Sequence, residues 1–379
     1  MLKNKPALFI KMNFICMPMA LLLSSCNNGS TTPSTQQIQY TTINYPNAGI
    51  GSTTGISGIR QVANSSDVYI AGSYYESGST NMGTLYKGPI LGGGTYYIYN
   101  YPSSTGATTN GTTVYSADNS SISGNVQLVG TYTTQESGTG TAFGFFYNGP
   151  IPSESSAWQS INFPSSQTPG QVTVKNTYPH SIMNGIVVGN YDADLIAGNA
   201  FIYNVNTESY TTLVKLGSVF TSAYGVWWNG GTSYTIAGGY SDESTTQLTN
   251  AYIVDYDSST GALTNWVTYN YNNKPGSILT HFQGITTDGA GGYNLAAGWE
   301  NNGILGASFV NVKRTASGSL SAVATWIDLV YPGSSTTTAN TVYQNYCLGI
   351  YNQPGIDQTN AYVATIPVSW YIYPYYQPN

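Results

Sequence analysis

The stretch GNYDADLIAGNAFIYN, residues 189–204, holds a small residue, an aromatic residue, a short acidic loop and then Ala-Phe at the start of a new apolar run. It is either one local hairpin or one copy of a repeated unit. Further apolar runs end in a small residue, any residue and an aromatic, with the small residue at Gly72, Gly130, Gly189, Gly238, Ala297 and Gly349. Their spacing of 49 to 59 residues excludes a single hairpin.

Two other motifs recur with the first. A pair such as Ala200-Phe201 follows each copy after a loop, and an aromatic-rich segment precedes it, as in residues 96–102 (YYIYNYP) and 158–164 (WQSINFP). One more apolar run lies between this segment and the first motif, as in residues 58–63 (GIRQVA). Each repeat is therefore expected to contain four short strands, with the aromatic-rich segment as its first strand.

The patterning of these segments indicates strands rather than helices. Apolar residues alternate, Gly and Asn turns separate the runs, and no segment after the N-terminal apolar stretch has the pattern of a capped helix. Four strands repeated about every 55 residues are typical of a β-propeller, whose blades bury faces that no single blade could bury. The sequence predicts an all-β, six-bladed β-propeller of four-stranded antiparallel blades. Residues 40–46 and 370–376 are competing candidates for the strand that closes the ring.

The combination of Val-Val-Gly-x-Tyr, a loop, Asn-Ala-Phe and an Asn-Tyr/Phe-Pro strand resembles the bacterial extracellular repeats of the HAF type. The resemblance extends over essentially the whole of residues 40–379. It implies a repeat β-propeller and export from the cell. Because that family is defined by its repeats rather than by a shared reaction, the resemblance implies no activity.

The N-terminus has the pattern of an export signal. Three lysines precede a short apolar stretch, which is too short and too poorly flanked for a stable membrane span. Leu23-Ser24-Ser25-Cys26 resembles the lipobox of bacterial lipoproteins, which implies a diacylated Cys26 at the mature N-terminus. We expect a lipoprotein signal peptide at 1–25, a lipidated flexible tether at 26–39 and the propeller domain at 40–379. Asn27 favours sorting to the outer membrane or cell surface over retention at the inner membrane.

The charge of the chain limits its partners. Without residues 1–25, seven basic residues face sixteen acidic ones, a formal charge of −9, and the only arginines are Arg60 and Arg314. Nucleic acids demand clustered Lys and Arg, so nucleic acid is excluded as a partner and the lipid anchor supplies the membrane contact. A surface of Tyr, Ser, Gly and Asn suits contact with an envelope or host protein or a glycan.

Acidic residues gather in the loops between the first and second motifs. They form a predicted rim on one face, which could bind Ca²⁺ or a cationic partner, although loops are also where a strand-rich protein places its charge. No other cofactor is expected, and no metal site is assigned. The rim residues are Glu76, Glu136, Asp192, Asp194, Asp242, Glu243, Glu300 and Asp357.

The aromatic, histidine and cysteine residues that could form a functional site also have simpler structural explanations. Trp227 and Trp228, with the tyrosines of 373–376, are predicted contact residues, and the blade core is an equal alternative. His180 and His281 lack further ligands at metal-binding spacing, and Cys347 occupies an apolar core position of the first motif.

Catalysis is less well supported than binding. A glycan-active hydrolase needs two convergent carboxylates, and no spacing selects a pair. A Gly-x-Ser-x-Gly nucleophile motif is absent. The preferred prediction is a binding or adhesion module, with a hydrolase or an envelope scaffold as alternatives. The carboxylates available to a hydrolase are Asp118, Asp255, Asp257, Asp288 and Asp328.

Overall fold

The computed structural model describes residues 36–104, 107–135, 141–193, 196–242, 249–274 and 279–372. Cys26, three rim residues (Glu136, Asp194 and Glu243) and the tyrosines of 373–376 lie outside these ranges. The region from Gln37 onward forms one compact unit, and it consists almost entirely of β-strands. None of its described helices is long and apolar enough to cross a bilayer.

The strands form consecutive antiparallel ladders. The bounds of the first three ladders are β2 (Ser52–Gln61), β3 (Val68–Glu76), β4 (Met82–Gly88) and β5 (Thr95–Ile98); β6 (Thr109–Asn119), β7 (Asn125–Thr134), β8 (Phe143–Pro150) and β9 (Trp158–Ser160); β10 (Val174–Met183), β11 (Ile186–Ala193), β12 (Ile196–Asn204) and β13 (Ser209–Leu213).

The remaining strands continue this pattern. They are β14 (Phe220–Gly230), β15 (Ser233–Ser241), β16 (Asn250–Asp257) and β17 (Leu263–Tyr269); β18 (Leu279–Thr287), β19 (Tyr293–Asn301), β20 (Ile304–Val312) and β21 (Thr325–Leu329); and β22 (Thr336–Thr337), β23 (Thr341–Tyr343), β24 (Tyr346–Asn352), β25 (Thr359–Thr365) and β1 (Gln39–Thr42). The helical segments are η1 (Ser155–Ala157), η2 (Ser165–Gln167), η3 (Pro169–Gln171), η4 (Tyr271–Asn273) and α1 (Ser369–Ile372).

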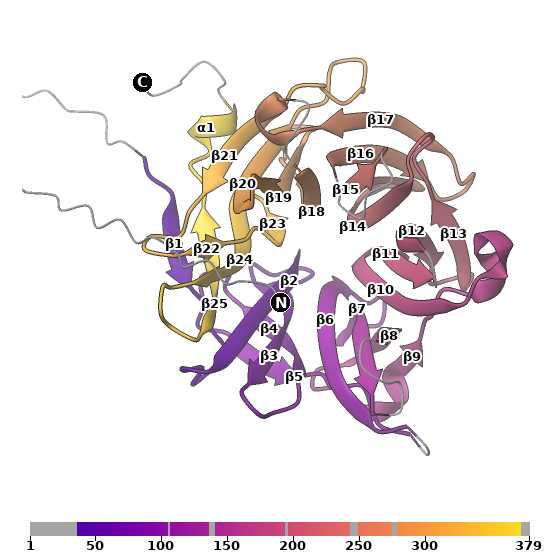
Figure 1. Cartoon of the computed structure of the whole chain (residues 1–379), viewed down its shortest axis with the longest axis vertical. Helices are drawn as coiled ribbons and strands as arrows, with labels where there is room; N and C mark the ends of the chain where they lie inside the picture. The colour runs from indigo at the N-terminus through magenta and orange to yellow at the C-terminus, as the bar shows by residue number, and fades with distance from the viewer. Residues whose placement is uncertain are drawn as a thin grey trace, which may run out of the picture. The chain divides into compact units, whose positions relative to one another are not determined.

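The ladders are arranged around a common centre (Figure 1). The first strands contact one another in the order β2, β6, β10, β14, β18, β23, and β23 contacts β2 again. Single parallel bridges join adjacent ladders at three places, Asn199 to Thr221, Thr53 to Thr359 and Asn81 to Gly111. The result is a radial, propeller-like arrangement of four-stranded antiparallel sheets, whose faces pack on each other to form the core.

The expected strand order within a repeat was wrong by one strand. The aromatic-rich segments pair with the preceding second motif: β5 pairs with β4, β9 with β8 and β13 with β12. Each is thus the outermost strand of one ladder rather than the first strand of the next. Alternating patterning specifies which face a strand buries but not which neighbour it pairs with.

The N-terminal strand completes the last ladder. Residues Gln39–Thr42 of β1 pair antiparallel with β25, from Gln39 opposite Thr365 to Thr42 opposite Tyr362. The competing C-terminal segment, residues 370–376, begins in helix α1, and its residues 373–376 lie outside the described structure. Of the two candidates, the structure pairs the N-terminal one.

A stacked ring pair explains why the aromatic motifs recur. The residue before the motif proline stacks on the aromatic residue of the first motif, as in Tyr101 on Tyr132, with ring centroids 3.7 Å apart, and Phe163 on Tyr191, at 3.9 Å. In one ladder a lysine replaces the ring, and Lys215 Nζ lies 4.0 Å from the Tyr240 centroid. The other pairs are Tyr45 with Tyr74, Tyr271 with Trp299 and Tyr331 with Tyr351.

A threonine of the following first strand fixes each of these stacking residues. The main-chain N–H of Tyr101 donates to Thr112 Oγ1 at 2.9 Å, and that of Phe163 donates to Thr177 Oγ1 at 3.1 Å. The same bond recurs at Thr54, Thr221, Thr280 and Thr337. This bond links the end of one ladder to the start of the next.

A β-bulge interrupts the pairing of the first strand with the second at the same place in successive ladders. The bulge leaves one extra residue on the first strand without a pairing partner on the second. Gly58 follows one bulge because a Cβ there would lie 2.3 Å from the carbonyl oxygen of Tyr115 on the next first strand. The extra residues are Ser57, Tyr115, His180, Tyr224 and Gln283.

Candidate functional site

A cavity of about 350 Å³ opens beside β18, β19 and β20, at the end of these strands that carries the rim loops. We call it the Trp299 pocket. Its lining includes His281, Gln283, Trp299, Glu300 and Asn340. The volume lies at the lower end of the range typical of small-ligand sites.

Trp299 is held in one position by its neighbours. Its Nε1–H donates to Ser308 Oγ at 3.0 Å, and that hydroxyl donates to Asp328 Oδ1 at 2.7 Å. Tyr271 donates to the other oxygen of Asp328 at 2.7 Å and packs against Trp299 with ring centroids 4.2 Å apart and ring planes tilted by 35°. Gly306 lies beneath the indole, where a Cβ would fall 2.0 Å from a ring carbon. The pocket therefore has a preorganised aromatic wall.

The polar side of the Trp299 pocket contains a neutral histidine and one carboxylate. The Gln283 amide nitrogen donates to His281 Nε2 at 2.7 Å, which places the ring proton on Nδ1. Burial lowers the pKa of His281 to about 4, so the ring is uncharged at neutral pH. Glu300 is half-buried and is the only Asp or Glu among the lining residues. This set can stack on a ligand ring and hydrogen-bond to hydroxyl groups.

The second histidine, His180, is linked to His281 through ring contacts with tyrosines of neighbouring first strands. The His180 ring lies 4.9 Å from that of Tyr115 and 4.7 Å from that of Tyr224, which in turn lies 5.7 Å from His281. Burial lowers the pKa of His180 to about 3. Within the described ranges no three His, Cys, Asp or Glu side chains are grouped to hold a metal ion.

The described rim residues lie at the same end of equivalent strands but serve different local roles. Asp192 accepts hydrogen bonds from Asn176 and from the main-chain N–H of Gly198, and Asp242 faces Lys215 at 4.0 Å. Glu76, the last residue of β3, and Asp357, in a loop, are exposed, and among the described rim residues Glu300 alone lines a described cavity.

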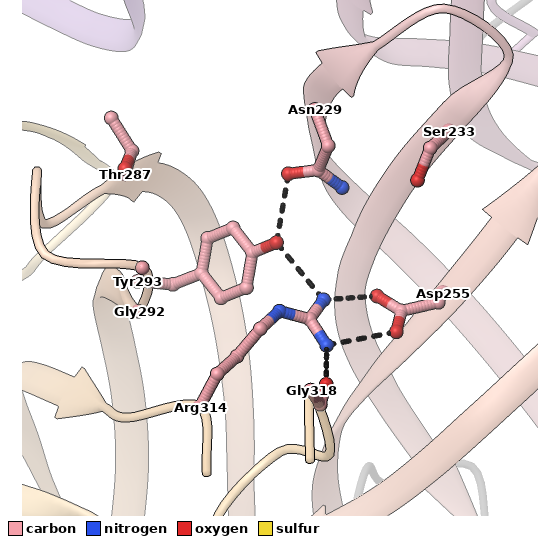
Figure 2. Close-up of a pocket in the computed structure, with 9 residues that line it drawn as sticks. Asn229, Ser233, Asp255, Thr287, Gly292, Tyr293, Arg314 and Gly318 are labelled. Carbon is pink, nitrogen blue, oxygen red and sulfur yellow. Dashed lines mark hydrogen bonds and ion pairs between the residues drawn. The ribbon is translucent and has the colours of Figure 1, made fainter. Parts of the chain in front are cut away.

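Asp255, a hydrolase candidate, is paired with an arginine in a separate cavity of about 310 Å³, the Arg314 pocket (Figure 2). Arg314 Nη1 donates to Asp255 Oδ2 at 3.0 Å, and Nη2 binds Oδ1, so the contact is bidentate. Tyr293 and Gly318 bind the same guanidinium. Burial opposes the charge, but the bonds to Asp255 and Tyr293 raise the pKa of Arg314 above its usual value.

The other hydrolase candidates are dispersed. Asp257 caps a turn by accepting from Ser259 and Thr260, and Asp288 pairs with Lys313 at 2.8 Å. Asp328 supports Trp299, and Asp118 lies in another cavity. No described cavity is lined by more than one Asp or Glu, so the structure does not bring a pair of these carboxylates together in a pocket.

The predicted aromatic contact residues separate. Trp227 lines a cavity with Arg60, whose Cζ lies 5.9 Å from the indole centroid. Trp228 is 36% exposed and donates to the Gly231 carbonyl. Cys347 is fully buried and burial raises the pKa of its thiol, which suits a core position rather than a nucleophile.

The sequence did not single out Trp299. One signal was available, because Trp299 is the one tryptophan at the aromatic position of the first motif, where the other copies have tyrosine. The bulge of β18 sets the positions of His281 and Gln283, and no sequence pattern predicts this bulge.

Comparisons with known proteins leave the family open. No protein-family model and no curated protein matches the chain. Among solved structures, an α-L-arabinofuranosidase from Lactobacillus brevis has 12% identity and a TM-score of 0.43, covering 71% of this chain and 94% of its own. A polysaccharide lyase described as an ulvan lyase has 12% identity and a TM-score of 0.40, covering 82% and 85%. These values decide nothing about the function.

Proposed function

We propose that this chain is an exported lipoprotein whose six-bladed β-propeller binds a glycan in the Trp299 pocket. Cys26 carries the acyl chains, residues 27–39 form the tether, and the propeller is displayed at the outer membrane or cell surface. The repeats resemble those of HAF-type proteins. The sixth blade consists of β22 to β25 with β1 as its outer strand.

The observation that carries this proposal is the fixed indole of Trp299 beside one carboxylate and two amide side chains. Aromatic faces stack on sugar rings, and amide and carboxylate groups bind sugar hydroxyls. A binding site needs no more than these groups. The described lining lacks the second carboxylate that a glycosidase of the paired type requires.

Glycan-array binding of the mature protein, with and without Ca²⁺, tests the proposed function. We expect a defined glycan to bind, Trp299→Ala to abolish binding, and Trp228→Ala to leave it unchanged. Trp228 is the matched control because its exposed indole lines none of the described cavities. Equal binding by both variants would contradict the placement of the ligand. Binding that requires Ca²⁺ would support a role for the acidic rim.

The lipid anchor has a separate test. Cys26→Ser should abolish acylation and release the protein from the membrane fraction, because the acyl chains contribute roughly 0.8 kcal/mol per buried CH₂. Unchanged acylation and attachment in this variant would refute the lipoprotein part of the proposal.

The hydrolase remains the alternative function. It would require a second carboxylate to approach Glu300 when substrate binds. The test is release of reducing sugar from a bound glycan. If the protein has this activity and Glu300→Gln loses it, the protein is an enzyme rather than a binding module.

A further inference from the structure

A third cavity, of about 450 Å³, lies at the opposite end of the first strands from the rim loops. We call it the Arg60 pocket. Its lining includes Arg60, Asp118, Met183, Trp227 and Tyr343, which come from different ladders. None of these residues takes part in the Trp299 pocket, so the function of this cavity is independent of the glycan site.

Arg60 is a buried cation held by neutral groups. Its residue is 7% exposed, Nη1 donates to the Ile59 carbonyl at 3.1 Å, and Nη2 donates to the Val226 carbonyl at 2.7 Å and to Ser181 Oγ at 3.2 Å. Nε has no hydrogen-bond partner among the described residues. A guanidinium carries five N–H donors, and three of them are used here, so one N–H of Nη1 remains for a ligand beside the buried, unpaired Nε–H.

Asp118 is a buried anion in the same cavity. It is also 7% exposed, and its Oδ2 accepts the main-chain N–H of Asn184 at 2.6 Å. No ion pair within 4.0 Å joins Arg60 to Asp118, although both line this cavity. Burial raises the pKa of Asp118, and the nearby positive charge of Arg60 only partly opposes that shift.

Two buried opposite charges that do not touch are costly, because each is desolvated without a direct partner. A ligand that carries both complementary charges a few ångströms apart would satisfy both groups at once. An α-amino acid has this property, since its carboxylate and ammonium are attached to the same carbon atom. Met183, Trp227 and Tyr343 form an apolar and aromatic part of the remaining lining and suit an apolar side chain, while Gln61, Asn64 and Asn119 are its polar part.

We propose that the Arg60 pocket binds a free α-amino acid with an apolar or aromatic side chain. Arg60 binds the carboxylate, Asp118 binds the ammonium group, and Trp227 contacts the side chain. No bond is made or broken, so the pocket is a recognition site rather than a catalytic one.

Calorimetry on the full chain, purified in detergent, tests this assignment with L-phenylalanine and L-leucine as probes. We expect at least one of them to bind. Two analogues of L-phenylalanine each lack one of its charges: 3-phenylpropanoate has no ammonium group and 2-phenylethylamine has no carboxylate. Each should bind at least about tenfold more weakly than L-phenylalanine, because it loses a charge-assisted hydrogen bond. Methyl glucoside is the neutral comparison. Failure of both amino acids to bind, or equal binding by the analogues, would overturn the proposal.

Variants assign the binding to this cavity. Asp118→Asn keeps the shape and the acceptor for Asn184 and should weaken amino-acid binding at least about tenfold. Glu300→Gln alters the Trp299 pocket and should leave amino-acid binding unchanged, which separates the two proposals. Arg60→Lys retains the charge but loses the planar donors and should also weaken binding. Amino-acid binding that survives Asp118→Asn, or methyl glucoside binding that this variant abolishes, would refute the assignment.

Discussion

The chain uses its two arginines in opposite ways. In the Arg314 pocket the guanidinium forms a bidentate pair with Asp255 and further bonds to Tyr293 and Gly318. In the Arg60 pocket the guanidinium bonds only neutral protein groups, and Asp118 lies in the same cavity without contacting it. In the Arg314 pocket the two opposite charges therefore neutralise each other. In the Arg60 pocket neither charge is in direct contact with an oppositely charged protein group.

The largest expected effect is a difference in coupling energy between the two Arg–Asp pairs, which double-mutant cycles measure. Arg314→Met should lower the free energy of unfolding by about 3–5 kcal/mol, because it leaves Asp255 partly buried without its cation. The cycle with Asp255→Asn should give a coupling above about 2 kcal/mol. The cycle of Arg60→Met with Asp118→Asn should give less than about 1 kcal/mol, since those groups are not in contact. Urea denaturation measures all seven proteins, and equal couplings would remove the distinction.

In contrast to the charged Arg and Asp residues, the two buried histidines are uncharged at neutral pH, and acid should destabilise the fold through them. The folded pKa values of His180 and His281 are about 3 and about 4, whereas an unfolded histidine titrates near 6.5. Between pH 6.5 and 4 the unfolded state therefore binds more protons, and stability present above pH 6.5 is lost as pH falls. Each histidine contributes about 1.4 kcal/mol per pH unit. His180→Tyr, which copies Tyr115 and Tyr224, should remove half of this slope in denaturation curves.

The same substitution at the two aspartates should have opposite signs. The pKa of Asp118 is raised by burial, so its contribution to stability is full below pH 3.8 and is lost as pH rises through the folded pKa. Asp118→Asn should therefore raise the free energy of unfolding at pH 7. Asp255→Asn should lower it, because Arg314 loses its partner. Thermal unfolding at pH 7 shows both signs, and a loss in Asp118→Asn would contradict the account of this pocket.

The smallest expected effect concerns Lys215, which occupies a position that is aromatic in the other ladders. Lys215 lies over Tyr240 where the other ladders have a tyrosine or phenylalanine. Lys215→Tyr should restore the stacked pair and change stability by about 0.5–1 kcal/mol at most. The reverse change, Tyr101→Lys, provides the matched comparison, and melting temperatures measure both. A large loss in Lys215→Tyr would show that the charge, rather than the shape, is needed there.

The repeat was predictable because its motif residues meet strict local demands. Gly189 is small because a Cβ would lie 2.2 Å from the Tyr178 carbonyl, and the aromatic residue two positions later, Tyr191, stacks on Phe163. The pairing partner of each aromatic-rich strand was not predictable, because β5 lies between two ladders in sequence and its alternation fits either. The threonine bonds were also missed, since a single Thr in a strand carries no positional signal.

The cavities were predictable only in fragments. Glu300, predicted as a rim residue, and Trp227, predicted as a contact residue, each line a cavity, but the two lie in different ones, and their binding roles stay predictions. Asp118 and Arg60 are far apart in sequence and meet only when the first strands surround a common centre. Spacing along the chain cannot show such a meeting, and neither can composition.

The pairing of β1 with β25 has a mechanical consequence. If Cys26 is anchored, any pull between the membrane and a bound ligand reaches the folded region through Gln39, the first residue of β1. The load then falls on one short ladder, from Gln39–Thr365 to Thr42–Tyr362, before it reaches another sheet. The strength with which this protein can hold a ligand under tension is therefore limited by the strand that closes its own fold.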